Sequence, residues 1–349
     1  MITVTQSISG TYFSANIPDV VFAIDGVCAD VAMTADGEQV YSERLYPVGG
    51  VIELAELDRL LTPYARQRLK VQLSVKIEEL AAESDSDAAA DTAELSADIV
   101  YCEADVNIAA ADFVASHFLT TLDGEKTTAV GRLEYLHFIG TDPASVTADY
   151  DDGTQRQFAL QPVAGNGRYT TLDVSPAQFD IDNKLLLGFA VQAGARSFRF
   201  AIDFDEPDCA PVLVFDNSFG VEELLYCTGT HTVAPSYKRE GYIGRYQRNY
   251  DITETRTFKA DTGILSFAMA NWADELFRSQ CVHVVNFKDG QPNIGKEVII
   301  TESKSEYTND GDSMPRFTFS YQYAQRNHNV LDTLRAGRIF DNTFDNTFN

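Results

Sequence analysis

Few residues in this 349-residue chain have the types and spacing that catalysis requires. The sequence contains no Gly-x-Ser-x-Gly segment and no local signature of a cysteine activated by a histidine. Its histidines are scattered, and single scattered histidines are usually structural or exposed. They are His117, His137, His231, His283 and His328. We therefore predict no catalytic residue and no cofactor, and we do not expect an enzyme.

A phosphate-binding loop is not indicated either. The segment "AGNGRYT" at residues 164–170 has two glycines, but no helical pattern follows it. A phosphate cradle needs the N-terminus of a helix directly after the glycines. We predict a hairpin tip at this position.

Two acidic segments resemble the oxygen-rich loops that bind calcium. They are "DYDDGT" at residues 149–154 and "DFDEPD" at residues 203–208. Neither has the spacing of an EF-hand loop, so we expect ordinary solvated turns and no metal. A glycosidase would need a pair of carboxylates, but the 52 acidic residues make any chosen pair uninformative.

The five cysteines are widely separated, and no Cys-x-x-Cys pair is present. They are Cys28, Cys102, Cys209, Cys227 and Cys281. Their odd number and spacing predict neither a disulfide framework nor a zinc site. We expect buried free thiols in a reducing compartment.

Aromatic and basic residues alternate in "YKREGYIGRYQRNYDITETRTFK", residues 237–259. In basic proteins, aromatic residues interleaved with Lys and Arg in this way often stack on the bases of a nucleic acid. The whole chain here has a formal charge of −25, which argues against that function. One interpretation is a long strand with a mixed aromatic face. The other is a protein interface anchored by Tyr and Arg, with Tyr246, Arg248 and Tyr250 as candidate contacts.

The chain ends in a repeated aromatic motif, "RIFDNTFDNTFN" at residues 338–349, and a near copy, "FDNSF", occupies residues 215–219. The Asp, Asn and Thr between the aromatic residues favour turns and extended chain over helix. We predict an assembly arm that adds to a sheet edge of its own chain or of a neighbouring copy. Its candidate contacts are Ile339, Phe340, Phe344 and Phe348.

The charge balance of 52 acids to 27 bases disfavours attraction to nucleic-acid phosphates or anionic lipid. The N-terminal residues lack the basic and apolar regions of a secretory signal, and no apolar run approaches the roughly 20 residues of a membrane span. These features predict folding in a cytoplasm, with no membrane partner and no specific nucleic acid.

The elements that would position these residues are mainly strands. Apolar residues alternate with polar ones at residues 69–77, 198–204 and 316–323, and Asp-Gly or Asn-Gly steps favour hairpin turns between strands. Helical patterns are few: "AELDRLL" before Pro63, "AADFVASHFLTTL" from Ala110, and an apolar stripe at residues 264–278. The fold class is mainly β, with two or three serial antiparallel sandwich or barrel modules, a few short helices and an extended C-terminal arm.

The segment at residues 81–97 is acidic and has almost no bulky side chain, so we expect the solvated tip of a long hairpin. The predicted organisation is an N-terminal β domain at residues 1–107, a helical connector at 108–129, a middle β domain at 130–210, a C-terminal β domain at 211–333 and the arm at 334–349.

The chain contains the segments "FDNSFGVEELLYCTGT", "YKREGYIGRYQRNYDITETRTFKADTGILS", "WADELFRSQCVHVV", "EVIITESKSEYT", "RIFDNTFDNTFN" and the N-terminal "VYSERLYPVGGVIELAELDRLLTPYAR". These segments resemble structural proteins from the tail regions of tailed phages and prophages of gut Bacteroidetes. The resemblance implies a virion component of the tail, tail tip or baseplate, assembling with its own copies and other virion proteins into a ring or tube.

Two other functions stay open. One is a carbohydrate-binding or receptor-binding β-sandwich adhesin, in which exposed tyrosines and Trp272 stack on sugars. The more distant one is a glycoside hydrolase with an acid pair.

Overall fold

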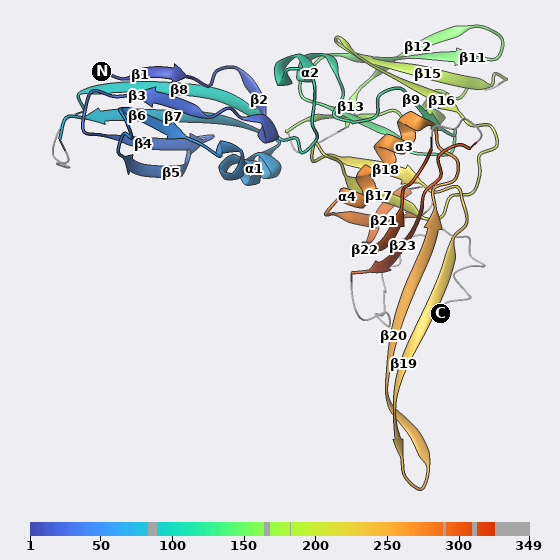
Figure 1. The fold of residues 1–349 in the computed structure, drawn as a ribbon. Helices are drawn as coiled ribbons and strands as arrows, with labels where there is room; N and C mark the ends of the chain where they lie inside the picture. The colour runs from blue at the N-terminus through green and yellow to red at the C-terminus, as the bar shows by residue number, and fades with distance from the viewer. Residues whose placement is uncertain (83–88, 164–167, 182, 289–290, 309–312, 325–349) are drawn as a thin grey trace.

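The computed structural model describes residues 1–82, 89–163, 168–181, 183–288, 291–308 and 313–324. Over these ranges the fold is mainly β, with several antiparallel sheets and a few short helices, which confirms the predicted fold class. Figure 1 shows an N-terminal part, a body beside it, and one long hairpin that leaves the body. In the described residues no helix has the length and apolar character to cross a bilayer. The predicted arm lies outside the described residues.

The N-terminal part is a pair of sheets around one core. Its apolar residues alternate along the strands, so each sheet buries one face. The larger sheet has the order β2 (Thr11–Phe13), β8 (Asp91–Val100), β7 (Lys70–Leu80), β4 (Cys28–Ala35), β5 (Glu38–Leu45), and the smaller has β1 (Thr3–Gln6), β3 (Val20–Ala23), β6 (Val51–Leu54). A 3-10 turn follows β2 at Ser14–Asn16.

The predicted long hairpin is confirmed, since β7 pairs antiparallel with β8 from Lys70 opposite Val100 to Glu79 opposite Asp91. The acidic loop is shorter than predicted, because residues 91–97 belong to β8. Ala93 and Leu95 pack against the core, although this segment has few apolar side chains and most of them are small. The bulky side chains of β7 supply most of the apolar area, and so β8 needs little of its own.

Helix α1 (Leu57–Arg68) runs through Pro63, where the sequence predicted its end. Leu57, Leu61 and Ala65 lie at i, i+4 and i+8 and are all buried. Pro63 lies on the exposed face, so the carbonyl group that loses its N–H partner can bond to water. Burial of the apolar stripe therefore outweighs the proline.

The body combines three sheets. The five-stranded sheet has the order β12 (Gln155–Leu160), β11 (Ala144–Tyr150), β15 (Leu186–Ala193), β16 (Arg196–Ile202), β9 (Glu125–Thr128). The smallest sheet has the order β10 (Tyr135–Phe138), β14 (Thr170–Asp173), β13 (Pro162–Val163). The seven-stranded sheet has the order β18 (Glu222–Tyr226), β17 (Val212–Asp216), β21 (Val282–Lys288), β22 (Gln291–Lys304), β23 (Thr318–Tyr323), β20 (Gln247–Asp261), β19 (Thr232–Ile243). A second 3-10 turn lies at Pro176–Gln178.

The predicted connector at residues 108–129 is only partly helical. Helix α2 (Ala110–Ser116) ends at His117, which has extended backbone angles. Beyond it, Leu119 N donates to the His137 carbonyl oxygen, and β9 joins the five-stranded sheet in parallel with β16. These backbone bonds to other strands replace the last turns of the expected helix.

The helix predicted at residues 264–278 is two helices, α3 (Phe267–Ala273) and α4 (Glu275–Arg278). Ser266 fixes the start, because its hydroxyl oxygen accepts from Met269 N as an N-cap. The predicted stripe is buried as expected at Met269, Trp272 and Leu276.

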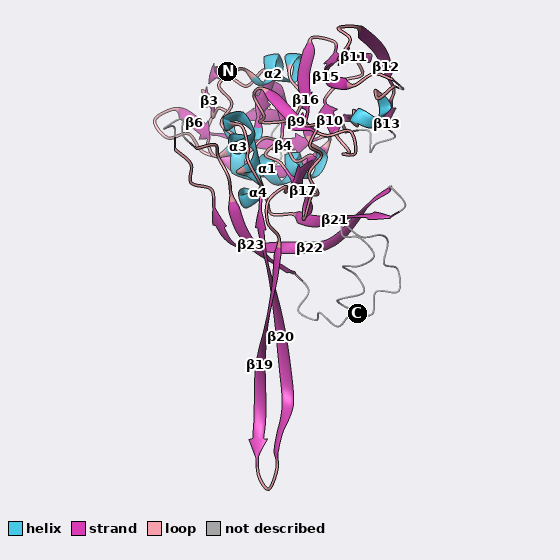
Figure 2. Cartoon of the chain, turned by 90° about the vertical axis from the view of Figure 1, so that its right-hand side faces the viewer, coloured by secondary structure: helices cyan, strands magenta, loops and turns pink. Residues whose placement is uncertain are grey.

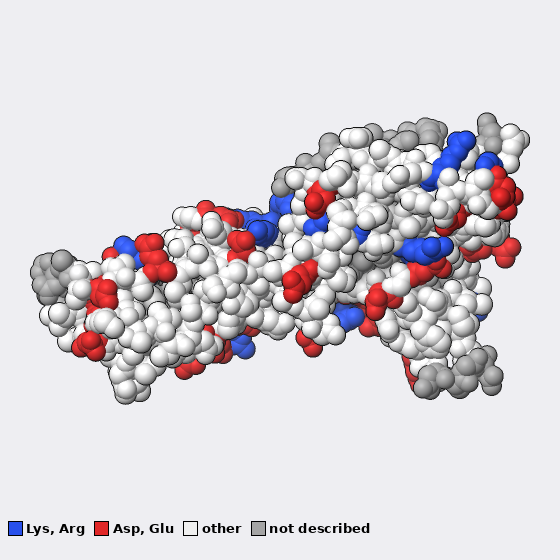
Figure 3. Space-filling view, turned by 90° about the horizontal axis from the view of Figure 1, so that it is seen from above, with Lys and Arg blue, Asp and Glu red and all other residues white. Residues whose placement is uncertain are grey.

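One hydrophobic cluster runs through the whole body. It joins buried residues of the five-stranded sheet, such as Phe189 and Phe200, to residues of the seven-stranded sheet, such as Phe215 and Tyr321, and to Trp272 of α3. The boundary predicted between residues 210 and 211 therefore lies within a shared core. Charged side chains of both signs are interspersed over the face of the molecule seen in Figure 3.

Candidate functional site

Strands β19 and β20 form a hairpin that extends far beyond the body (Figure 1, Figure 2). Near the body β20 also pairs with β23, from Phe258 opposite Tyr321 to Asp261 opposite Thr318. Outside that pairing lies the outer hairpin, residues 235–253, which pairs with no further strand of the described residues. All residues from 235 to 253 are exposed. The outer hairpin is thus held by cross-strand contacts, and neither of its faces is buried against the rest of the described chain.

The outer hairpin carries large aromatic and aliphatic side chains in water. Tyr246 is 71% exposed, Tyr250 is 72% exposed and Ile243 is 80% exposed. Tyr237, Tyr242 and Ile252 are exposed as well. An isolated two-stranded hairpin is marginally stable in water, and exposed apolar groups gathered on one element mark an interaction surface.

The structure places the three candidate contacts predicted for this segment on the exposed end of the hairpin. Tyr246 lies in the turn, and Arg248 lies opposite Tyr242. The Tyr250 hydroxyl group donates to Glu240 Oε2 at 3.0 Å. The other predicted contacts, Ile339, Phe340, Phe344 and Phe348, lie outside the described residues.

A bulge divides the aromatic face that the sequence predicted to be continuous. Glu240 pairs with Asp251 and Gly241 pairs with Asn249, so Tyr250 is an extra residue on β20. Ile252 lies opposite Arg239, whereas Arg248 lies opposite Tyr242, three residues farther along β19. Because an odd step along a strand changes the face, the tip presents aromatic and basic groups on both faces.

The tip is basic, in contrast to the chain as a whole. Residues 237–250 contain four bases and one acid, whereas the chain carries 52 acids and 27 bases. The Arg239 guanidinium lies 5.2 Å from the centre of the Tyr237 ring, and Lys238 pairs with Glu240 at 3.5 Å. Arg and Tyr side chains that are exposed in this way are the residue types most enriched at the centres of interfaces.

The comparisons with known proteins identify no family. No protein-family model matches the chain, and no curated protein matches it. Among solved structures, it is similar to "Crystal Structure of Rst D1-D2" at 11% identity and a TM-score of 0.22, over 58% of this chain and 98% of that one. It is also similar to the I9-I11 tandem from titin at 7% identity and a TM-score of 0.18, over 93% of this chain and 90% of that one. Structural similarity this low supports no statement about family or function.

The near copy of the terminal motif is a strand end followed by a turn. The Asn217 side chain closes the turn, since its Oδ1 accepts from Phe219 N at 2.9 Å and its Nδ2 donates to the Leu119 carbonyl oxygen at 2.8 Å. Phe215 and Phe219 are both buried, and they belong to different hydrophobic clusters. The motif here joins two cores within one chain.

Two histidines are held neutral by burial. His137 Nε2 donates to the Glu222 carbonyl oxygen at 2.9 Å, and its Nδ1 accepts from Thr171 Oγ1 at 3.0 Å. Burial lowers the pKa of His137 to about 4, and it lowers the pKa of His231 to about 4. Neither side chain is therefore a general base that titrates near neutral pH.

We expect stability to fall as the pH drops from 6.5 toward 4. In the unfolded chain a histidine takes up its proton near pH 6.5, whereas folded His137 does so only at about pH 4. The stability is fully present above the unfolded pKa, and His137 alone removes about 2 kcal/mol of it by pH 5. Urea denaturation above pH 6.5 and at pH 5 measures this loss. His137→Gln, which keeps a donor for the carbonyl oxygen of Glu222, should lose about 2 kcal/mol less; an equal loss contradicts the prediction.

Cys281 and His283 form a pair that sequence reasoning missed. Cys281 Sγ lies 3.7 Å from His283 Nδ1, because residues at i and i+2 of a strand share a face. Burial and the nearby charges of Asp216 and Glu297 raise the pKa of the Cys281 thiol. A protonated thiol is a poor nucleophile, so the pair does not resemble an activated cysteine. All five cysteines are free thiols, and Cys28, Cys102 and Cys227 are buried.

A polar cavity of about 370 Å³ lies between the N-terminal part and the body. Asp216 and Glu222 line it from directly opposite positions on β17 and β18. Burial raises the pKa of both carboxyl groups. Two carboxyl groups whose pKa values are raised hold their protons to a higher pH than usual.

The acidic segment at residues 149–154 contains a hydrogen-bonded turn. Asp152 Oδ1 accepts from Thr154 N at 3.0 Å, and Asp152 Oδ2 pairs with Lys184 Nζ at 2.6 Å. These contacts lower the pKa of Asp152, with the bond to Lys184 contributing most. Within the ranges that the structure describes, no group of three or more His, Cys, Asp or Glu side chains is placed to hold a metal ion.

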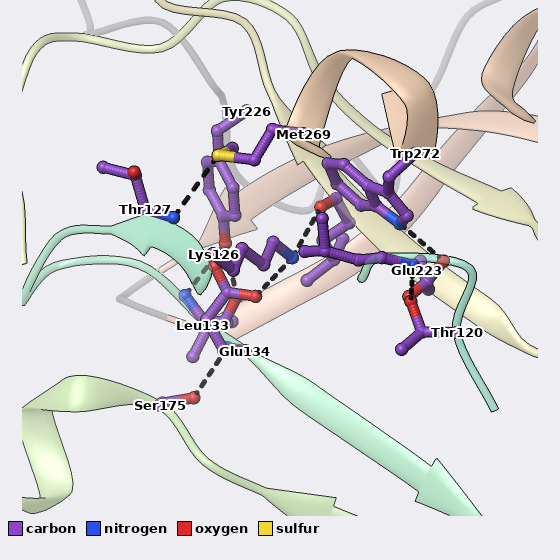
Figure 4. A network of polar contacts seen from close by, with 12 residues as sticks. Thr120, Lys126, Thr127, Leu133, Glu134, Ser175, Glu223, Tyr226, Met269 and Trp272 are labelled. Carbon is purple, nitrogen blue, oxygen red and sulfur yellow. Dashed lines mark hydrogen bonds and ion pairs between the residues drawn. The ribbon is translucent and has the colours of Figure 1, made fainter. Parts of the chain in front are cut away.

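A buried network of polar groups holds the segments of the body together (Figure 4). Lys126 Nζ donates to Glu134 Oε2 at 2.7 Å and to the Leu224 carbonyl oxygen at 3.3 Å, and it lies 4.6 Å from the centre of the Trp272 ring. Trp272 Nε1 donates to Glu223 Oε2 at 2.8 Å. Burial raises the pKa of Glu223. The network is enclosed by β9, β18 and α3, so we assign it to stability.

Proposed function

We propose that this chain is a structural subunit that assembles with copies of itself, and that the β19–β20 hairpin is its assembly element. The observation that carries the proposal is the exposure of Tyr242, Ile243, Tyr246 and Tyr250 on a hairpin that projects from the body. Burying these side chains against a partner supplies roughly 25 cal/mol for each Å² of apolar area removed from water.

Backbone groups support the same role. In the outer hairpin the outward edges of β19 and β20 pair with no further strand of the described chain. Open strand edges are templates for pairing with another chain. Tyrosine adds a large contact area at a low cost in conformational entropy, because its side chain has few rotatable bonds.

The resemblance in sequence supports a role for this assembly in a virion. We propose a component of the tail, tail tip or baseplate of a tailed phage, which folds in the host cytoplasm and then joins a ring or tube with its own copies and other virion proteins. In this proposal the predicted C-terminal arm supplies a second contact. The subunit acts as a building block, and its function requires no cofactor and no specific nucleic acid.

Removing the outer hairpin should abolish self-assembly and leave the fold intact. Ser236 and Thr255 pair directly across the ladder, so an Asn-Gly turn can join them in place of residues 237–254. Light scattering after size-exclusion chromatography should show oligomers for the natural chain and monomers for the variant. Their circular dichroism spectra should differ only by the strand signal of the removed residues. An unchanged oligomer mass for the shortened chain contradicts the proposal.

Imaging tests where the subunit acts. Negative-stain micrographs of particles with a label at the C-terminus should show rings or tubes that contain the protein. Labels confined to positions outside the tail argue against the virion assignment and leave the self-assembly result standing.

The exposed tyrosines favour one alternative, a receptor-binding or carbohydrate-binding protein. Tyr237, Tyr242, Tyr246 and Tyr250 present aromatic faces that could stack on sugars. Trp272 takes no part in such binding, because it is 1% exposed and donates to Glu223. This alternative is supported if the natural chain is a monomer that binds to a glycan array and if removing the outer hairpin abolishes that binding.

A further inference from the structure

One end of the five-stranded sheet gathers the two acidic segments of the sequence. Strand β15 runs antiparallel to both β11 and β16, so its start lies beside the ends of both neighbours. Asp151 N donates to the Leu185 carbonyl oxygen at 3.0 Å, and Gly188 lies opposite Ala201 one residue before the end of β16. The turn at residues 151–154 and the loop at residues 203–208 therefore flank Leu185 and Leu187. We call this region the acidic end.

The acidic end combines negative charge with exposed apolar side chains. The loop at residues 203–208 contains four acids and no base. Leu185 is 50% exposed, Leu187 is 43% exposed and Phe204 is 52% exposed. Phe204 was predicted to continue the buried alternation of β16, but it lies in a turn beyond that strand. Its exposure leaves an aromatic ring among carboxylates.

The hairpin tip and the five-stranded sheet that carries the acidic end lie on opposite sides of the body. Figure 1 and Figure 2 both show β11, β12 and β15 at the top and the hairpin pointing down. The tip, residues 237–250, is basic and aromatic, and the acidic end is negative and apolar. The two surfaces are complementary in charge and both expose apolar groups.

We propose that the hairpin tip of one copy docks on the acidic end of a second copy and joins the copies head to tail. This inference rests on the proposed self-assembly and names its partner surface. Arg245 and Arg248 pair with carboxylates of the loop at residues 203–208, while tyrosines of the tip pack on Phe204 and the leucines of β15. Because the two surfaces differ, a docked pair still has one tip and one acidic end free, and further copies add until a ring closes or a filament grows.

Charge reversal on each surface tests this contact. The tip variant carries Arg245→Glu and Arg248→Glu, and the acidic-end variant carries Asp205→Lys and Glu206→Lys. Each should weaken self-association at least about tenfold, because like charges then face each other. Combining all four substitutions in one chain should restore assembly. Matched controls are Arg59→Glu on α1 and Glu53→Lys on β6, which are exposed elsewhere and should assemble like the natural chain.

Sedimentation velocity across a range of concentrations measures the association. Salt should weaken it, because the screening length falls to roughly 3 Å at about 1 M ionic strength. If the tip variant weakens and the acidic-end variant assembles normally, the hairpin docks elsewhere and this inference is overturned, while self-assembly stands. A combined variant that stays apart also overturns it. Assembly that persists after removal of the hairpin rejects the proposed function itself.

Discussion

Lys126→Ala should lower the free energy of unfolding by about 3–5 kcal/mol, because it leaves buried carboxylates without their cation. The Lys126 side chain is 10% exposed and the Glu134 side chain is 2% exposed. Lys126 supplies a full positive charge to the network drawn in Figure 4, which also contains Glu223. Urea denaturation at pH 7.5 measures the loss.

The loss should shrink at low pH, which separates lost charge from lost packing. Burial already raises the pKa of Glu223 and Lys126 opposes that rise, so without Lys126 its carboxyl group favours the neutral form more strongly and the variant recovers stability as Glu223 is protonated. Lys126→Met keeps most of the apolar stem, and pairing it with Glu134→Gln should recover most of the stability. Lys76→Ala is the matched control, because Lys76 forms an exposed pair with Glu78 that contributes about 0–1 kcal/mol. A loss of that size for Lys126→Ala would contradict the prediction.

Local patterns predicted the strands well, because alternation records which face of a sheet is buried. Val71, Leu73, Val75 and Ile77 are all buried on β7, as the alternation required. The Asp36-Gly37 step forms the turn between β4 and β5, and both residues have positive φ angles. These features depend on neighbours along the chain, and so sequence alone contains them.

The errors arose where distant segments decide the structure. The helix from Ala110 ends at Ser116 because His137 offers Leu119 a backbone partner from another strand. The acidic segment at residues 91–97 becomes a strand because β7 provides its bulky neighbours. In each case the deciding group lies outside the segment, so its own residues cannot reveal it.

The candidate site was only half predictable for the same reason. Alternating aromatic and basic residues indicated a strand with possible contacts at Tyr246, Arg248 and Tyr250. Whether the strand stays on the body depends on which other segments pack against it, and the residue pattern of the strand does not contain this information. The bulge at Tyr250 divides the predicted face, because it inserts one residue opposite the regular strand β19.

Phe219→Ala should lower the free energy of unfolding by about 3–5 kcal/mol, the range for removing a buried Phe. Phe219 is 1% exposed and comes from the turn between β17 and β18, yet it packs in the core of the N-terminal part. Its ring stacks on Phe113 at 4.9 Å between centres and lies 6.2 Å from Phe13. The body thus inserts one of its own side chains into the neighbouring core.

The loss should change the form of unfolding as well as its midpoint. With Phe219 in place the two cores share a buried contact, and we expect a single cooperative transition. Without it, calorimetry should show two separate transitions, because the N-terminal sheets lose this aromatic contact with the body. Phe204→Ala is the control: this ring is 52% exposed, and its removal should change stability by at most about 0.5 kcal/mol. One transition with a loss below about 1 kcal/mol for Phe219→Ala would show that other contacts couple the two cores.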